Sequence, residues 1–261
     1  MPKNTLMIIG SGIKFMSHLT VEAKACIEKS DKVLYLVNEP VMEEWIKITN
    51  VNTESLQQYY NQSPLRNDNY LSIAKYIVGN LKTINNLCVV TYGHPTVFVQ
   101  PLLYAAEMAL AEGHDVTILP GISTEDCLFA DLKLDPGSCG CQSFEATDFL
   151  LYRREYDDSS HLVIWQPFVI GVLGLPIDHH PKKGLELLKE YLIEKYPLDH
   201  EVIIYEAAQY PLFKPRIECV LLKDLPIANI SRLTTLYIKP NQIKKPNQYM
   251  LSKLSFIQNA D

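Results

Sequence analysis

The stretch LCVVTYGHPTVFV, residues 87–99, joins a short apolar run to a turn that contains Gly93, His94 and Pro95. A valine-rich run of this length, bounded by glycine and proline, predicts a buried strand that ends at Gly93. In a parallel sheet this turn would lie at the carboxyl end of its strand, where open α/β sheets bind ligands. Gly93 would also let a ligand come close to the backbone.

Strands and helices alternate around this stretch over the first 120 residues. Further apolar runs predict strands at residues 5–10, 32–37 and 115–121, and helical spacing predicts helices at residues 20–30, 67–82 and 100–113. The residues expected to cap or bound these helices are Thr20, Asn67 or Asp68, Pro101 and Gly113. Such alternation indicates a mainly parallel sheet covered on both faces.

The second half of the chain has more strands for each helix, so we expect a mixed sheet there. Ser123 and Asp126 form a capping-box pattern at the start of a helix. Strands are predicted at residues 161–166, 201–207, 216–222 and 234–239, with a helix at residues 182–196. We therefore predict an α/β protein of two domains, an N-terminal one at residues 1–120 and a C-terminal one at residues 121–240, followed by a polar tail at residues 241–261.

The composition is that of an ordinary globular protein. Of the 261 residues, 47% are hydrophobic and 21% are charged, and the net charge of −6 gives no basic face for nucleic acid. No apolar stretch is long enough to cross a bilayer, and we expect no signal peptide because the apolar run near the start is too short for one. The six cysteines are scattered, and only Cys139 and Cys141 are close, without a second pair at zinc spacing. We expect a cytoplasmic protein without a metal and without a nucleic-acid or membrane partner.

Three candidate binding positions each have more than one interpretation. Gly10-Ser11-Gly12 follows a predicted strand, but Phe15 stands where a dinucleotide-binding loop has its third glycine, so a simple tight turn explains it equally well. His94 fits a ligand contact, a base or a cap for the following segment. Gln166 at the end of a predicted strand fits either a contact to a bound nucleoside or an ordinary loop amide.

The stretch QYYNQSPLRNDNY, residues 58–70, brackets one arginine with three tyrosines. Phenol hydroxyls and a guanidinium are donors suited to a reacting carbonyl. The alternative is structural: Tyr70 could face the core together with Ile73 and Ile77, and Arg66 could be a solvated loop charge.

Four stretches together resemble the tetrapyrrole-methylase superfamily, the two-domain class III methyltransferases that use S-adenosylmethionine. They are GSGI at 10–13, YGHPTVFV at 92–99, LPGISTEDCLFADLKLDPGSCGCQSFEATDFLL at 119–151, and HLVIWQ at 161–166. The Gly-His-Pro turn resembles in particular the borosin α-N-methyltransferases, which methylate backbone amides of a ribosomal precursor peptide. The resemblance covers roughly residues 4–240.

The resemblance implies a catalytic set of Tyr60, Arg66, Tyr70 and Tyr92. An amide nitrogen is a poor nucleophile because its lone pair is delocalised into the carbonyl, so it must lose its proton or gain imidate character. We expect Tyr70 to act as the base or proton relay, and Tyr60 and Arg66 to orient and polarise the carbonyl. Tyr92 would position the amide. Tyr59 matches the family less well.

The resemblance also implies S-adenosylmethionine as cofactor, with S-adenosylhomocysteine as product. The positions that match cofactor contacts are Gly10, Gly12, Tyr92, Gly93, His94, Pro95, Val97, Phe98, Ser123, Thr124, Gln166 and Ala207. Amides at the Ser123 helix start are expected to serve the cofactor's carboxylate. Thr96, where the family usually has glycine, and Pro167 depart from the family pattern.

In fused borosin enzymes the methylated peptide is the enzyme's own C-terminus. Residues 239–261 are short and polar and lack a Val/Ile/Gly-rich core, so we expect a split system with a separate precursor protein that carries a C-terminal core segment. The resemblance further implies a homodimer that forms a heterotetramer with its precursor. The alternatives are a small-molecule porphyrin or corrin methylase, whose polycarboxylate substrate would want several basic residues, and a binding module without catalysis.

Overall fold

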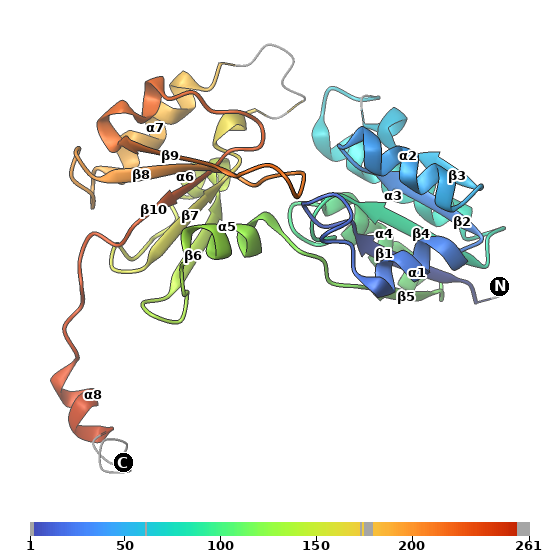
Figure 1. Cartoon of the computed structure of the whole chain (residues 1–261), viewed down its shortest axis with the longest axis horizontal. Helices are drawn as coiled ribbons and strands as arrows, with labels where there is room; N and C mark the ends of the chain where they lie inside the picture. Colours follow the sequence, from blue (N-terminus) through green and yellow to red (C-terminus); the bar gives the residue numbers. More distant parts are fainter. Residues whose placement is uncertain (1–2, 61, 173, 175–179, 255–261) are drawn as a thin grey trace. The chain divides into compact units, whose positions relative to one another are not determined.

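The computed structural model describes residues 3–60, 62–172, 174 and 180–254 (Figure 1). The chain forms two compact units that do not follow chain order. The first contains Met1–Leu134 together with Gly171–His179 and Glu206–Arg216, and the second contains Asp135–Ile170, His180–Tyr205 and Ile217–Asp261. Two later segments thus return to the unit that holds the Gly-His-Pro turn.

The first unit is built on a five-stranded sheet in the order β3-β2-β4-β1-β5, and all its pairings are parallel. Its strands are β1 (Thr5–Gly10), β2 (Lys32–Leu36), β3 (Thr53–Ser55), β4 (Asn86–Thr91) and β5 (Asp115–Ile118). This confirms the predicted parallel sheet. The short strand β3 was not predicted, because three half-buried residues give no apolar run.

Helices cover both faces of this sheet. They are α1 (Val21–Lys29), α2 (Pro40–Thr49), α3 (Arg66–Asn80) and α4 (Gln100–Ala111), and the unit also contains α5 (Thr124–Leu132). Leu87 and Val89 of β4 pack in the core beneath α3 and α4, whereas Cys88 and Val90 pack with α1 and α2. Burial on both faces explains why this strand is a continuous apolar run.

The second unit has a mixed five-stranded sheet, as predicted, in the order β6-β7-β10-β8-β9. β6 (Cys141–Glu145) runs parallel to β7 (His161–Trp165), and β10 (Thr235–Ile238) is antiparallel to both β7 and β8. The other elements that follow residue 134 are β8 (Glu201–Glu206), β9 (Arg216–Leu221), α6 (Ala146–Leu151), α7 (Lys182–Leu192), α8 (Gln248–Lys253) and the 3-10 turns η2 (Pro167–Val169) and η3 (Leu222–Ile227). The 3-10 turn η1 (Gln57–Tyr59) belongs to the first unit. Among the described residues, no helix has the length and apolar character needed to cross a membrane.

Backbone contacts between glycines close the carboxyl edge of the first sheet. The Gly12 amide donates to the Gly93 carbonyl at 3.2 Å, and the Gly93 amide donates to the Gly12 carbonyl at 3.1 Å. A Cβ on Gly10 would lie 2.0 Å from the Gly93 carbonyl oxygen, and one on Gly121 would lie 2.9 Å from it. β4 therefore ends at Thr91 rather than at the predicted Gly93, because Gly93 pairs with the loop after β1.

The returning segment Glu206–Arg216 is bound to the first unit through Tyr210, whose hydroxyl donates to the Glu39 carboxylate. Glu39 also caps α2, accepting from the amides of Val41 and Met42 at 3.0 and 2.6 Å. Burial alone would raise the pKa of Glu39, but these three hydrogen bonds hold it below its usual range.

The Gly10→Ala substitution should destabilise the first unit by about 2 kcal/mol or more, because a backbone oxygen occupies the position of the new methyl group. Gly79→Ala is the matched control, since a Cβ at Gly79 meets nothing within 4 Å. Gly79 lies in α3, where alanine should stabilise by about 0.5–1 kcal/mol. Urea unfolding of both variants measures the difference, and equal stabilities would contradict the described contact.

Tyr210→Phe should lower the stability of the first unit in a pH-dependent way. The pKa of Glu39 is depressed in the folded state, so its contribution is present above the unfolded value of about 4.3 and is lost as the pH falls below it. The difference between wild type and variant in urea midpoint should therefore be largest near neutral pH and shrink below about pH 4. A difference that stays constant with pH would rule out the carboxylate as the partner of Tyr210.

Candidate active site

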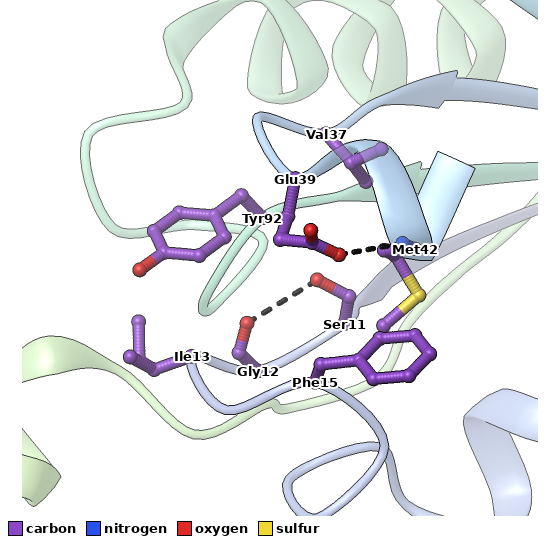
Figure 2. A pocket seen from close by; sticks show the side chains of 8 residues that line it. All are labelled: Ser11, Gly12, Ile13, Phe15, Val37, Glu39, Met42 and Tyr92. Atoms are coloured by element: carbon purple, nitrogen blue, oxygen red, sulfur yellow. Dashed lines mark hydrogen bonds between the residues drawn. The ribbon is translucent and has the colours of Figure 1, made fainter. Parts of the chain in front are cut away.

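The loops after β1 and β4 form the centre of the candidate site. Their strands are neighbours in the sheet, and Gly12 and Gly93 pair directly. A pocket opens beside this pair (Figure 2), and its lining residues are Ser11, Gly12, Ile13, Phe15, Val37, Glu39, Met42 and Tyr92. The structure thus brings together four residues named from sequence, Gly10, Gly12, Tyr92 and Gly93, at the edge where open α/β sheets bind ligands.

Tyr92 is half-buried and lines the pocket at this sheet edge, directly before Gly93. Burial raises the pKa of Tyr92 to about 12, while a hydrogen bond with the Gln209 side chain acts in the opposite direction. Tyr92 is therefore protonated at neutral pH, and its phenol is a hydrogen-bond donor rather than a base.

The imidazole of His94 stabilises the turn in which it lies by contacts to Thr96. Its Nδ1 accepts from the Thr96 amide at 3.2 Å and lies 3.1 Å from the Thr96 hydroxyl oxygen. The family's usual glycine at position 96 would lack that hydroxyl, so this departure adds a contact to the turn. Further along, Val97 and Phe98 are exposed, and Phe98 adopts a left-handed conformation with φ of 57°.

Tyr60 and Tyr70 lie together, with ring centroids 5.9 Å apart in an edge-to-face arrangement. Burial, followed by the influence of Tyr70, raises the pKa of Tyr60 above its usual value, and nearby Arg66 only partly offsets this. The guanidinium therefore does not turn Tyr60 into a base. Like Tyr92, Tyr60 is a neutral donor at physiological pH.

Arg66 is the first residue of α3, and its guanidinium is bound to the returning segment Gly171–His179. Its Nη2 donates to the carbonyl of Val172 at 3.0 Å and to that of Gly174 at 3.4 Å. Within the described ranges, no carboxylate forms an ion pair with Arg66. The side chain is half-buried rather than a solvated loop charge.

The start of α3 differs from the prediction. Neither Asn67 nor Asp68 caps the helix, which begins after Leu65 without a side-chain cap. Asn69 instead accepts from the Ser63 amide at 2.7 Å and donates to the Ser63 carbonyl at 2.8 Å. Asn69 is only 1% exposed, so this pair of bonds holds the loop that leads into Arg66.

Sequence reasoning missed Asn69, although a signal was present. Asn69 precedes the fully buried residues Ile73 and Ile77 by four and eight positions and so lies on the buried stripe of α3. An amide at such a position needs buried hydrogen-bond partners. Tyr70 adjoins this stripe and is half-buried, so its burial fits both the catalytic and the structural interpretation.

Tyr59 belongs to a different cluster. Its ring stacks on Tyr76 with centroids 4.3 Å apart, and the Tyr76 hydroxyl donates to Glu54 at 2.6 Å. Glu54 in turn pairs with Lys32 at 2.7 Å. These contacts give Tyr59 a structural role, in keeping with its weaker match to the family.

The predicted capping box of α5 is present, and the hydrogen-bond donors of Ser123 are both bound to Asp126. The Ser123 amide and hydroxyl both donate to Asp126 at 2.7 Å. The Ser123 amide thus already has a carboxylate partner, and the expectation that amides at this helix start serve the cofactor's carboxylate stays a prediction. Thr124 follows as the first residue of the helix.

Ala207 and Gln166 lie in different units. Ala207 belongs to the returning segment Glu206–Arg216 of the first unit, two residues before Gln209. Gln166 follows β7 in the second unit and adopts a left-handed conformation with φ of 55°. Its part in the site stays a prediction. In the part of the chain that is described, no group of three His, Cys, Asp or Glu side chains could hold a metal ion.

Known proteins are similar to nearly the whole chain. The chain is 37% identical over 257 residues to the methyltransferase/ribosomally synthesized cyclic peptide gymnopeptides precursor of Gymnopus fusipes, covering 97% of this chain and 61% of that protein. It is 36% identical over 262 residues to the methyltransferase/ribosomally synthesized type I borosin cyclic peptide precursor of Coprinopsis marcescibilis, covering 98% and 66%. The chain thus spans less than two thirds of the length of these relatives.

The fold also matches solved structures of low sequence identity. Uroporphyrin-III-C-methyltransferase from Thermus thermophilus superposes with a TM-score of 0.63 at 16% identity, covering 91% of this chain and 92% of that one. The family model for tetrapyrrole (corrin/porphyrin) methylases matches residues 5–218. The glycine-paired sheet edge and strands β6, β7 and β8 of the second sheet lie within that match, and this chain belongs to the tetrapyrrole (corrin/porphyrin) methylase family.

Proposed function

We propose that this protein is a methyltransferase that uses S-adenosylmethionine to methylate backbone amide nitrogens of a ribosomal precursor peptide. The observation that carries the proposal is the donor set around Arg66: a guanidinium without a described carboxylate partner, beside the neutral phenol of Tyr60. Such donors suit the oxygen of an amide that is losing its proton. The names of the relatives, which join a methyltransferase to a peptide precursor, support the same substrate class.

The residues at the sheet edge fit the cofactor. Gly93 has a positive φ of 72°, and a Cβ there would meet only the tip of Ile13 at 3.4 Å, so the backbone is open to a ligand. Gly10, Gly12 and Gly93 would hold the cofactor through their backbone, beside a largely apolar pocket. When bound, S-adenosylmethionine supplies a methyl group on a positively charged sulfur, which keeps the bonding electrons when the methyl leaves.

The side chains of this chain would prepare the amide. Loss of the amide proton moves negative charge onto the carbonyl oxygen, where Arg66 and Tyr60 would donate hydrogen bonds, each contributing about 3 kcal/mol to the transition state. Raised pKa values make Tyr60 and Tyr92 donors. Tyr70 is proposed as the base or proton relay of the set that the family resemblance implies. Tyr92, next to the glycine pair, would position the amide.

The second candidate function is methylation of a small tetrapyrrole, which the family name suggests. A porphyrin or corrin precursor carries several carboxylates and would need several cations. The residues described at the site offer the single guanidinium of Arg66 among neutral phenols, and the net charge of the chain is −6. A backbone amide, with one carbonyl oxygen, matches this arrangement better.

Intact-mass measurement tests the function. The purified chain and small proteins encoded beside its gene are incubated with S-adenosylmethionine, and the mass of each polypeptide is followed. Steps of one methyl, located by fragmentation to backbone nitrogens, would establish the activity. The polypeptide that gains the mass decides whether the precursor is separate, as expected, and native mass of the complex tests the proposed homodimer and heterotetramer.

The contrary results are equally definite. Cofactor binding without a mass shift in any peptide, together with methylation of a porphyrin or corrin precursor, would establish the small-molecule function. Cofactor binding without methylation of either class would leave only the binding module. The cytoplasmic location stays a prediction that fractionation of the producing cell tests.

Replacement of either the proposed proton acceptor or the guanidinium should abolish most of the methylation activity. Tyr70→Phe and Arg66→Lys should each lower the methylation rate by about 100-fold or more, because one removes the proton acceptor and the other the forked donor. Tyr152→Phe and Arg153→Lys are matched controls on exposed residues of the second unit. Full rates for Tyr70→Phe and Arg66→Lys, measured as methyl groups added per minute, would refute the assigned roles.

A further inference from the structure

The loop after β1 is closed by two hydrogen bonds between residues four positions apart. The His18 amide donates to the Lys14 carbonyl at 3.1 Å, and the Lys14 amide donates to the Nδ1 atom of the His18 imidazole at 3.2 Å. Ile13 and Phe15 of the same loop line the pocket beside the glycine pair (Figure 2). The His18 side chain therefore helps to hold a loop that forms one wall of the proposed cofactor site.

His18 also packs directly against Gly12. A Cβ atom on Gly12 would lie 2.3 Å from the His18 Cβ and 2.8 Å from the His18 carbonyl oxygen, so no side chain fits between the two residues. Gly12 in turn forms two reciprocal backbone hydrogen bonds with Gly93. Contacts thus run without interruption from His18, through Gly12, to the glycine pair at the centre of the site.

The hydrogen bond from the Lys14 amide requires a neutral imidazole at His18. A ring nitrogen that accepts a hydrogen bond carries no proton, so the single proton of the neutral ring is on Nε2. A second proton, on Nδ1, would turn this nitrogen into a donor and place it against the donating amide. The conformation of the loop and the protonation of His18 are therefore linked.

The groups that face the His18 ring favour its neutral form. Burial lowers the pKa of His18, and the ammonium group of Lys14 acts in the same direction. Asp126 and Asp131 of α5 act in the opposite direction and are the weaker influences. The Cys127 Sγ atom, also on α5, lies 4.0 Å from Nδ1, and burial raises the pKa of this thiol to about 11, so it faces the ring without a charge.

We infer that His18 is a positioning residue for the cofactor: its neutral imidazole, by accepting from the Lys14 amide, holds the loop after β1 in the conformation that binds the cofactor at the glycine pair. This inference rests on the proposed function and adds to it a residue that lies outside the predicted cofactor contacts. His18 acts through the loop and through Gly12, and it needs no contact with the cofactor itself.

Two substitutions separate the acceptor from the charge of the ring. His18→Asn keeps an acceptor atom bonded to Cγ, where Nδ1 is, and takes up no proton near neutral pH, whereas His18→Leu keeps a branched side chain without an acceptor. Isothermal titration calorimetry at pH 8 measures the Kd for S-adenosylmethionine. It should stay near the wild-type value for His18→Asn and rise about fivefold to tenfold for His18→Leu, because one hydrogen bond is lost.

The pH dependence of binding supplies a readout that a merely structural role would not change. The pKa of His18 lies below its ordinary value of about 6.5, so the neutral form predominates at higher pH. As the pH falls through the pKa of His18, the wild-type Kd should rise by up to about tenfold for each unit, because the fraction of competent protein falls by that factor. The ratio of the wild-type Kd to that of His18→Asn, followed from pH 8 to pH 5, isolates this effect from groups that titrate in both proteins.

Two further measurements complete the test. An NMR titration of the His18 ring protons, assigned by their absence in His18→Asn, gives the pKa of His18 independently of any binding or activity. His200→Asn is the matched control, because His200 lies in the second unit with its Nε2 3.0 Å from the Lys239 carbonyl oxygen. This control should leave both the Kd and its pH profile unchanged.

Each contrary result has a distinct meaning. An unchanged Kd in His18→Leu, an equal loss of affinity in both variants, or the same pH profile in the wild type and His18→Asn would overturn the positioning role while leaving the proposed function intact. The pH profile of His18→Asn decides the question even if His18→Leu fails to fold. A wild-type protein that binds no S-adenosylmethionine at pH 8 would overturn the proposed function, and the role assigned to His18 with it.

Discussion

The pairing of Gly12 with Gly93 is the contact on which the rest of the site depends. It brings the loops after two adjacent parallel strands within backbone hydrogen-bonding distance, and it requires that Gly10 and Gly121 carry no side chain where the Gly93 carbonyl lies. The loops after β1, β4 and β5 therefore meet at one edge. Tyr92, the residue before Gly93, is held beside that edge because the backbone on both sides of it is hydrogen-bonded.

The electrostatics of the site favour the donation of hydrogen bonds to a negatively charged oxygen. Burial raises the pKa values of Tyr60 and Tyr92, so both phenols keep their protons, and Arg66 keeps a charge that no described carboxylate neutralises. Neutral phenols and one cation stabilise a single developing oxyanion better than they bind a polycarboxylate. This balance links the fold to the proposed methylation of an amide, whose carbonyl oxygen is where negative charge builds.

Two segments from later in the chain complete this arrangement. Val172 and Gly174 receive the Arg66 guanidinium, and Gln209 and Tyr210 tie down the loops of the sheet edge. The side chain of Arg66 is therefore held by residues more than 100 positions away along the chain. A substitution in these segments could change the reaction without touching a substrate.

The sequence by itself determined the architecture. The spacing of apolar residues and the residues that bound each element predicted the parallel and the mixed sheet. These signals are local: β4 is a continuous apolar run because both of its faces are buried, and the capping box of α5 lies within four consecutive residues. The sequence also named Tyr60, Arg66, Tyr70 and Tyr92 as a candidate catalytic set, through its resemblance to a known family. It missed α2, the role of Asn69 and the bonds of Glu39, Gln209 and Tyr210. Only the tertiary structure decided these, because a hydrogen bond between distant residues leaves no period in the chain, and because burial, which sets the protonation of the tyrosines, exists only after folding.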